Sequence, residues 1–236
     1  MRVSVVVPVY NEVERLERCI ERLKPELERI SPDYEIIIAE DGSTDGTKEL
    51  AEKLSKENKN VIHLHSDERL GRGRALNRAF KMSSGDILVY MDADLATDLR
   101  HLETLIGCIR DGAHFATGSR MLKGSDTERP MKREIASRIY NFLVRFLFRI
   151  HIRDMQCGFK AFERKALFDI LDEIEDNHWF WDTECLIRAD RKGYRVVEFP
   201  VRWRHEGGTK VEISKDAREM GKKLIKLWWR LWRENT

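Results

Sequence analysis

The stretch "DILVYMDADLATD" (residues 86–98) joins an apolar run to three carboxylates, Asp92, Asp94 and Asp98. The run predicts a buried strand, so negative charge gathers just where that strand ends. Either the loop is simply solvated, or it meets something positive. A DxD after a strand suits the second interpretation, because alternate residues of a strand point the same way.

Outward from this stretch, apolar runs alternate with helical segments through the first half of the chain. Five such runs predict strands, at 3–9, 34–41, 61–65, 86–94 and 113–120. The alternation predicts an α/β fold with a doubly wound, mixed but mostly parallel sheet, which binds ligands at the carboxyl ends of its strands. Tyr10, Glu12, Asp41 and Asp94 all follow strand ends, so we expect them to converge.

After Arg120 the rhythm changes. The sequence predicts a long basic and aromatic helix over 131–152, a loop and helix over 154–171, a further helix from 179, and a strand pair over 194–204. A last amphipathic helix follows near the carboxyl end. The first helix, after residue 11, is expected to break near Pro25.

Composition limits the function classes. Lys+Arg 43 against Asp+Glu 41 give a net charge of only +2 in 236 residues, so charge does not favour nucleic acid as a partner. The four cysteines are scattered without a CxxC pair, which indicates reduced thiols and a cytoplasmic protein. We see no signal peptide and no uncharged run of the ~18 residues that a membrane span needs.

Two other ligand types fit less well. "DGSTDGTKELAE" (41–52) places oxygen side chains at calcium-loop positions, but a strand precedes it where an EF-hand has a helix. The "GRG" at 71–73 begins a dinucleotide pattern, but Leu76 stands where its third glycine belongs. A divalent cation that bridges carboxylates and substrate phosphates suits the DxD better.

The motifs "VVVPVYNE", "EDGSTDGT", "GRGRALNRAF" and "DILVYMDADL" occur in this order. Together they resemble the inverting family-two glycosyltransferases of GT-A fold, over nearly the whole chain. In the second half, "GSR", "RDMQCGFKAF", "WFWDTE" and "VRWRHEGGTK" are similar to the polyprenyl-phosphate hexosyltransferases, the group of dolichyl-phosphate glucosyltransferase and dolichyl-phosphate mannose synthase. The resemblance implies three parts: 1–120 for the sugar nucleotide, 121–212 for the acceptor, and 213–236 as a basic interfacial helix.

The resemblance also implies roles on the donor side. The nucleotide-sugar residues are Pro8, Tyr10, Glu12, Asp41, Asp92, Arg204 and Lys210. Among them Asp92 faces the sugar or ribose, and Arg204 and Lys210 close over the pyrophosphate from a late basic loop. Asp94 holds Mg²⁺ or Mn²⁺, and Ala96 stands where the mannose synthases have a second metal contact. Pro8 has a plainer role as a strand end, and Asp41 as a helix cap.

On the acceptor side the resemblance assigns Arg120, Arg133 and Ser137 to the acceptor phosphate. Arg133 and Ser137 are one helical turn apart and share a face. Asp182 of "WDTE" stands where transferases with hydroxyl acceptors keep a base, and here it orients sugar hydroxyls or arginines. Asp92, Asp94, Asp182 and Arg204 are thus the expected catalytic residues. For Arg133 the alternative is a side chain that reaches the membrane surface.

The function that follows is transfer of a hexose from UDP-glucose, or next GDP-mannose, to a polyprenyl (dolichyl) phosphate. The alternatives are a protein or glycan acceptor, or a non-catalytic sugar-nucleotide or membrane-surface binding protein. A lipid acceptor implies a location on the cytoplasmic face of a membrane. The last helix predicts how: Ala217, Met220, Leu224, Leu227, Trp228, Leu231 and Trp232 share one face, flanked by Lys and Arg. That face either binds lipid or packs on protein.

Overall fold

The computed structural model describes residues 1–204 and 213–233, with the side chains of the last helix described from Arg218 onward. A seven-stranded mixed sheet runs through it in the order β3-β2-β1-β4-β7-β5-β8. Its strands are β1 (Val3–Val9), β2 (Tyr34–Glu40), β3 (Val61–Leu64), β4 (Ile87–Met91), β5 (Phe115–Ser119), β7 (Phe159–Glu163) and β8 (Val196–Pro200). A small second sheet pairs β6 (Asp126–Glu128) with β9 (Arg202–Arg204) in parallel.

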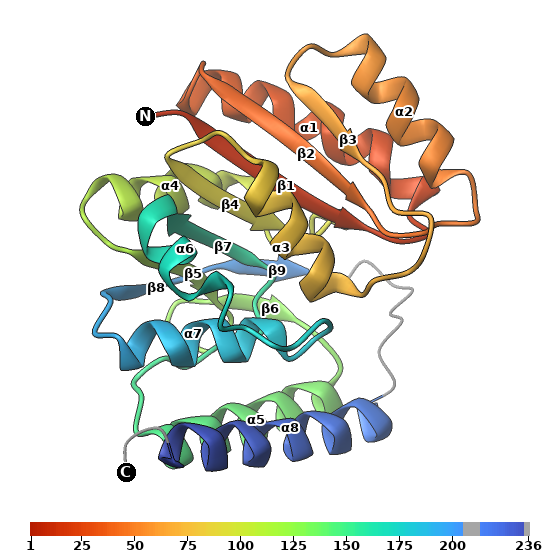
Figure 1. Ribbon diagram of the computed structural model, residues 1–236. Coiled ribbons are helices and arrows are strands. Elements are labelled where there is room, and N and C mark those ends of the chain that lie inside the picture. Colours follow the sequence, from red (N-terminus) through yellow and green to blue (C-terminus); the bar gives the residue numbers. More distant parts are fainter. Residues whose placement is uncertain (205–212, 234–236) are drawn as a thin grey trace.

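Helices cover both faces of the large sheet (Figure 1). One face carries α1 (Val13–Ile30), α2 (Thr47–Glu57) and α4 (Leu102–Arg110), which follows the short 3₁₀ turn Leu99–His101. The other face carries α3 (Arg72–Met82), α6 (Arg164–Leu171) and α7 (Trp181–Arg191). Alternation along the strands feeds both cores, since Val5 and Val7 face the first and Val6 faces the second.

The first helix does not break where we expected. α1 continues to Ile30 with Pro25 inside it. Leu16, Ile20, Leu23 and Leu27 are buried at helical spacing, whereas Pro25 is exposed, where water can bond the carbonyl that the missing N–H leaves free. Packing of the apolar face therefore outweighs the local cost of the proline.

Two strand predictions in the second half are corrected. The segment after residue 154 was expected as loop and helix, but residues 159–163 form β7, antiparallel to both β4 and β5. The expected strand pair at 194–204 is two strands of different sheets, because β8 pairs with β5 and β9 pairs with β6. Strands from both halves of the chain therefore share one sheet, as a single domain requires.

Strand direction brings the polar loops to one edge of this sheet. β1, β2 and β4 are parallel neighbours, so the loops after them lie together. Because β7 is antiparallel to β4 and β5, its amino-terminal end lies at the same edge as the carboxyl ends of those two strands. Residues near 10, 41, 92, 120 and 158 thus meet at one place.

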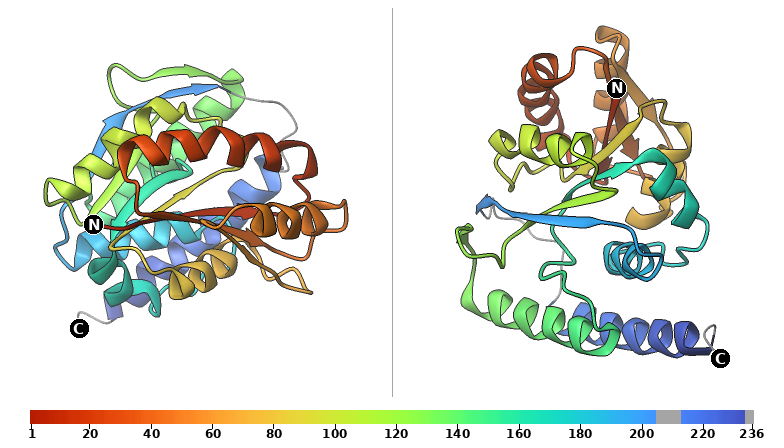
Figure 2. Two further views of the ribbon diagram at one scale, coloured as in Figure 1. Left: turned by 90° about the horizontal axis from the view of Figure 1, so that it is seen from above. Right: turned by 90° about the vertical axis from the view of Figure 1, so that its left-hand side faces the viewer.

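An outer layer is formed by α5 (Met131–Phe148) and α8 (Ile213–Arg233), which lie side by side beyond α7 (Figures 1 and 2). The predicted apolar face of the last helix points inward. Met220, Leu224, Leu227 and Leu231 are buried in the second core. Of the two expectations for this face, packing on protein holds for these four residues, whereas Trp232 is exposed. Contact of the helix with a membrane stays a prediction. None of the described helices combines the length and apolar character that a bilayer span requires.

Candidate functional site

The DxD loop lies at the centre of the polar edge. Asp92 follows β4, and its N–H donates to the carbonyl of Gly158 at 3.2 Å. Leu95 adopts a left-handed conformation with φ of 55°, and Asp94 Oδ1 accepts the N–H of Ala96 at 3.0 Å. Burial raises the pKa of Asp94 above its usual value. The two aspartates therefore form a compact negative group with a fixed backbone.

Arg72 neutralises part of this charge. Its Nη2 lies 2.6 Å from Asp92 Oδ1, and its guanidinium lies 5.3 Å from the ring centre of Tyr90 and 4.9 Å from that of Trp179. Burial raises the pKa of Asp92; the Arg72 charge lowers it and the Asp94 charge raises it further. Because 37% of the Asp92 side chain is exposed to solvent, the net rise in its pKa is smaller than full burial would give. Sequence reasoning gave Arg72 no role; its only signal was an arginine in the glycine turn "GRGR".

The loops after β1 and β2 are fastened to each other. Asn11 accepts the N–H of Thr44 at 2.8 Å, and the N–H of Glu12 donates to the Thr47 hydroxyl at 2.9 Å. Glu12 Oε2 accepts from Arg15 at 3.1 Å, which places this pair beside Asp94, whose pKa both side chains influence. The expected nucleotide residue Glu12 thus lies next to the expected metal residue.

Asp41 is buried, and its two oxygens bind backbone at the start of α3. Oδ1 accepts the N–H of Leu70 at 2.7 Å and Oδ2 that of Gly71 at 2.9 Å. Asp41 therefore has a structural role similar to the helix cap that we considered for it, although it binds the backbone that precedes α3. Nearby, the Arg69 guanidinium stacks 3.9 Å from the ring centre of Tyr10, and half-buried Pro8 lies within β1 rather than at its end. Contact of these residues with a nucleotide stays a prediction.

Asp182 lies at the start of α7, beneath the DxD loop. It is buried, its Oδ1 lies 2.8 Å from Lys160 Nζ, and it also accepts the Tyr90 hydroxyl. Lys160 is fully buried and donates to the carbonyls of Met155 and Cys157 at 3.0 and 2.6 Å. Asp182 thus fixes Tyr90, beside which the Arg72 guanidinium lies, and its expected role in orienting an arginine stays a prediction.

A second cationic group, Arg120 and Arg129, lies near the DxD loop. Arg120 binds buried Asp154 through two bonds of 2.7 and 2.8 Å, and its charge reaches Asp92. Arg129 shares the Trp203 ring with it, at 6.0 Å against 5.8 Å for Arg120. Burial lowers the pKa of Arg129 and the Arg120 charge lowers it further. Within the described residues Arg129 Nε is buried without a hydrogen-bond partner.

Arg129 was missed by sequence reasoning, because no spacing relates it to Arg120 or Trp203. Arg133 and Ser137 both lie on α5, one turn apart as expected. Ser137 accepts from the Asn141 amide through its carbonyl at 2.9 Å, and Asn141 in turn accepts the N–H of Met155. The helix is thereby tied to the loop that carries Asp154.

The described residues include the start of the late basic loop. Arg204 ends β9, and its N–H donates to the Ala96 carbonyl at 2.9 Å, beside the DxD. Its guanidinium pairs with Asp126 at 2.5 Å and Glu128 at 3.2 Å on β6. Contact of Arg204 with a pyrophosphate therefore requires these surface pairs to open. Lys210 lies outside the described residues.

The DxD fits a divalent cation that brings further ligands with its substrate. Asp92 and Asp94 repel each other, and Arg72 is the ion-pair partner of Asp92 among the described residues, so a cation would relieve the remaining charge. Among the described residues, one group of three His, Cys, Asp or Glu side chains lies close enough together to hold a metal ion. It consists of Glu40, His63 and His65 and contains neither aspartate of the DxD. Mg²⁺ and Mn²⁺ suit such a site, because they accept one or two carboxylates plus phosphate oxygens.

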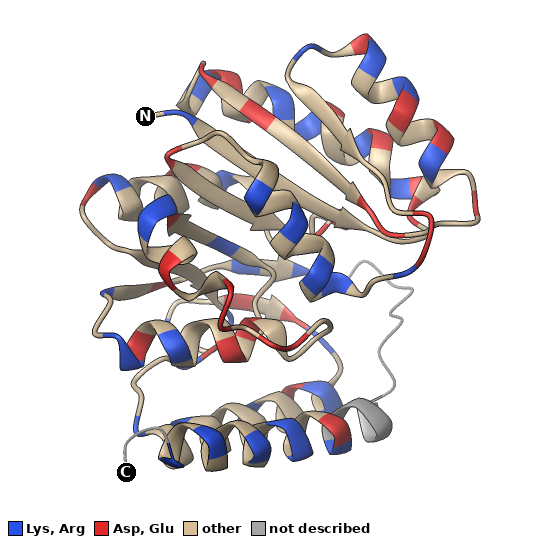
Figure 3. Ribbon diagram, in the orientation of Figure 1, with Lys and Arg blue, Asp and Glu red and all other residues tan. Residues whose placement is uncertain are grey.

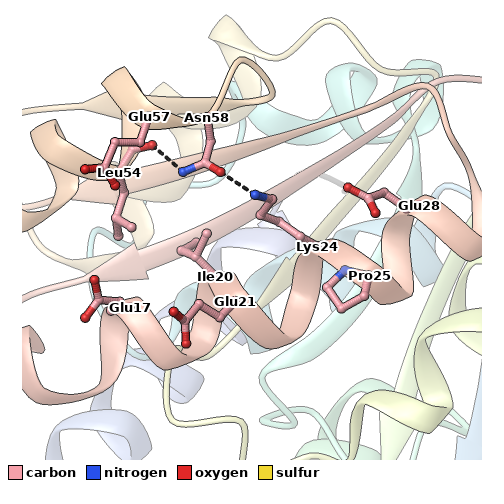
Figure 4. Close-up of a pocket in the computed structure, with 9 residues that line it drawn as sticks. All are labelled: Glu17, Ile20, Glu21, Lys24, Pro25, Glu28, Leu54, Glu57 and Asn58. Carbon is pink, nitrogen blue, oxygen red and sulfur yellow. Dashed lines mark hydrogen bonds between the residues drawn. The ribbon is translucent and has the colours of Figure 1, made fainter.

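A hollow between α1 and α2 does not fit the donor. It is lined by four glutamates, three other polar or proline residues and two aliphatic ones (Figure 4): Glu17, Glu21, Glu28, Glu57, Lys24, Asn58, Pro25, Ile20 and Leu54. Lys24 is held by Asn58, as Figure 4 shows. The excess of carboxylates would repel a diphosphate.

Comparison with known proteins shows which family the chain belongs to. Residues 4–171 match the family described as "Glycosyl transferase family 2". Glycosyltransferase AglD of Haloferax volcanii is 50% identical over 98% of this chain, which spans 38% of the length of AglD. Dolichyl-phosphate beta-glucosyltransferase of Saccharomyces cerevisiae is 32% identical over 94% of this chain and 72% of its own length. Polyprenol monophosphomannose synthase of Mycolicibacterium smegmatis is 30% identical over 85% of this chain and 76% of its own length.

Solved structures share the fold. Glucosyl-3-phosphoglycerate synthase of Mycobacterium tuberculosis, in complex with Mn²⁺, UDP and glucosyl-3-phosphoglycerate, superposes with a TM-score of 0.68 at 20% identity, over 95% of this chain and 77% of that one. The mannosyltransferase PcManGT of Pyrobaculum calidifontis, in complex with GDP-Man and Mn²⁺, superposes with a TM-score of 0.61 at 21% identity. The match covers 89% of this chain and 58% of that one. The GT-A fold expected from the sequence is thus confirmed.

Proposed function

Because this chain belongs to glycosyl transferase family 2, we propose that it transfers a hexose from a sugar nucleotide to a polyprenyl (dolichyl) phosphate with inversion at the sugar carbon. UDP-glucose is the favoured donor and GDP-mannose the next. Relatives named dolichyl-phosphate beta-glucosyltransferase, at 30–32% identity, and a polyprenol monophosphomannose synthase, at 30%, support the acceptor class more strongly than the choice of sugar.

One observation carries the acceptor assignment. Arg120 and Arg129 lie at one Trp203 ring, Arg120 is paired with Asp154, and Arg129 Nε is buried without a partner in the described part of the chain. A lipid phosphate would supply the missing acceptor oxygens beside two guanidinium groups. Arg133 and Ser137 on the first turns of α5, the helix that follows Arg129, would extend this contact.

On the donor side, Asp94 with Asp92 would hold Mg²⁺ or Mn²⁺, which would offset charge on the diphosphate leaving group. Arg72 holds Asp92 in place, and Asp182 holds Tyr90 beneath Arg72. Pro8, Tyr10, Glu12 and Asp41 border the nucleotide, and Arg204 with Lys210 contacts its phosphates.

The reaction needs positioning more than proton transfer. An oxygen of the lipid phosphate, already anionic at neutral pH, forms the new bond to the sugar carbon from the face opposite the nucleotide. The bond to the nucleoside diphosphate breaks, and the electron pair leaves with that group. Since no proton has to be removed, the engagement of Asp182 by Lys160 is compatible with turnover.

The layer of α5 and α8 provides the contact with the membrane that a lipid acceptor requires. Its outward side exposes large apolar side chains: Met131, Ile135, Ile139, Phe142, Leu143 and Phe146 from α5, with Ile225, Trp229 and Trp232 from α8. Lys and Arg recur along α8 among them (Figure 3). Aromatic and basic side chains together suit an anionic lipid surface, so we place the protein peripherally on the cytoplasmic face of a membrane.

The test is incubation of purified protein with a panel of sugar nucleotides, Mg²⁺ or Mn²⁺, and either polyprenyl phosphate or a peptide or glycan acceptor. We expect mass spectrometry to find hexosyl phospholipid with one donor, UDP-glucose first. Glycosylated peptide or glycan without glycolipid would replace the lipid acceptor by the alternative class.

A further inference from the structure

A second candidate metal site lies at the edge of the sheet, where β2 and β3 end. Glu40, His63 and His65 each offer one ligand atom, and these atoms all lie within 4.8 Å of one another. His63 and His65 are two residues apart on and just after β3, so they point the same way. Glu40 is the last residue of β2, the strand that pairs with β3.

Hydrogen bonding within the cluster does not account for His63. Only 10% of it is exposed, and its Nε2 is buried without a hydrogen-bond partner among the described residues. That nitrogen lies 3.9 Å from Glu40 Oε2, too far for a hydrogen bond. His65 Nδ1 contacts the same oxygen. One carboxylate oxygen thus faces two imidazole nitrogens, and one of the two has nothing to bind.

The surroundings of the cluster match a built site. His65 Nε2 lies 3.0 Å from Asp67 Oδ1, and a carboxylate on the second nitrogen is the usual partner of a metal-bound histidine. Glu40 Oε1 accepts the N–H of Ser43 at 2.5 Å, which orients Oε2 toward the two histidines. The backbone of His65 is fixed in turn, because its carbonyl accepts from Arg78 at 3.1 Å.

We infer that Glu40, His63 and His65 bind a divalent transition metal ion of the zinc class, with a fourth position open to water. Two imidazoles and one carboxylate are a common set for Zn²⁺ and an unusual one for Mg²⁺. Ligands of tetrahedral zinc lie roughly 3.4 Å apart, so His63 has to approach Glu40 and the ion has to replace the hydrogen bond between His65 and Glu40. Lys48 and Glu52 of α2 act on His63 with opposite signs, and the Lys48 charge also acts on His65.

Such an ion would join the ends of β2 and β3 directly before Asp41, whose carboxylate holds Leu70 and Gly71. It would stiffen the side of the sheet edge proposed for the nucleotide. The site uses none of the DxD residues and does not depend on the proposed transfer.

The experiment uses the full chain without a histidine tag, freed of metal by a chelator and then titrated with Zn²⁺ by calorimetry. Co²⁺ serves as a spectroscopic probe, since its visible absorption reports tetrahedral nitrogen and oxygen ligands. We expect one ion per chain, and a melting temperature that rises by about 5 °C or more at 100-fold excess over Kd.

Variants assign the site. His63→Gln and His65→Gln are expected to weaken binding at least 100-fold, and Asp67→Asn, at a residue with 92% side-chain exposure, by about tenfold. Two variants are expected to keep full affinity: exposed His151→Gln, as a matched histidine control, and Asp94→Ala. The inference is overturned if wild type binds no Zn²⁺ below millimolar concentration. It is equally overturned if Asp67→Asn and both histidine variants bind as wild type, or if only Asp94→Ala loses the ion.

Discussion

Gly158 lies directly against the carboxylate of Asp92, since a Cβ atom built on Gly158 would lie 1.9 Å from Asp92 Oδ2. The contact joins the start of β7 to the loop after β4. No side chain larger than hydrogen can stand there unless Asp92 moves.

Gly158→Ala is therefore expected to displace Asp92 from Arg72 and to lower kcat/KM by about 100-fold, because a shift of about 1 Å at a reacting centre costs that much. Steady-state kinetics with a thermal melt checks this. Gly107→Ala is the control: it lies in α4, a Cβ there meets nothing within 4 Å, and turnover should be unchanged. Equal kinetics for the two variants would show that Asp92 needs no fixed position.

Arg129→Ala is expected to raise the KM for lipid phosphate about tenfold or more, because it removes one of the two guanidinium groups at Trp203. The Kd for the sugar nucleotide, measured by calorimetry, should stay within about twofold, and Arg133→Ala should act in the same direction. The control is Arg138→Ala on α5, whose side chain is 59% exposed and pairs with Glu134. Equal losses of nucleotide and lipid binding would contradict the acceptor assignment.

The Arg120–Asp154 pair gives a pH signature. Burial raises the pKa of Asp154, but the Arg120 charge and hydrogen bonds outweigh it and hold the pKa at about 2, below the ordinary 3.8. A carboxyl group whose pKa is lower in the folded than in the unfolded protein stabilises the fold at pH values above its unfolded pKa. That stabilisation is lost as the pH falls toward its folded pKa. Asp154→Asn should cost ~3–5 kcal/mol at neutral pH, since it leaves buried Arg120 unpaired.

The difference in unfolding free energy between wild type and Asp154→Asn should therefore be full above about pH 4 and shrink from there toward pH 2. Denaturant unfolding at a series of pH values measures it, and acid effects common to both proteins cancel. A difference that stays constant down to pH 2 would show that the pair is not what holds Asp154 ionised.

The outward side of α5 and α8 should bind anionic vesicles. Phe142→Ser with Trp229→Ser is expected to lower vesicle binding about tenfold or more at unchanged stability, because each removes a large exposed apolar side chain. The matched control is Phe168→Ser on α6, an exposed aromatic outside this layer. Binding that survives the double substitution, or that does not weaken with salt, would place the contact elsewhere. Deletion of α8 is no clean test, because Leu224, Leu227 and Leu231 belong to the core.

Much of the fold follows from local pattern. Apolar β-branched runs such as 3–9 and 34–40 predict buried parallel strands, and parallel strands bring Glu12, Asp41 and Asp94 to one edge whatever the details. β7 was missed because "FKAFE" carries Lys160, which is fully buried with Asp182 as its partner. Its partner lies 22 positions away, and no local signal announces that pairing.

The same limit applies to the last helix and to the site. An amphipathic stripe has the same spacing whether it covers lipid or protein, so the sequence predicted the stripe and left open what covers it. Arg72 acquires its role from contact with Asp92, 20 positions along the chain, and Arg129 from contact with Trp203, 74 positions along. Pairings of this kind come from tertiary structure alone.

The most direct test of the account is the rate of hexosyl phospholipid formation by wild type, Asp94→Ala and Asp98→Ala, with and without divalent cation. Asp98 is the control from the same loop, since its carboxylate caps the 3₁₀ turn through Arg100. We predict that wild type and Asp98→Ala make product only with cation and only from the phosphorylated lipid, while Asp94→Ala makes essentially none. Full turnover by Asp94→Ala in excess EDTA, or equal turnover with unphosphorylated polyprenol, would contradict it.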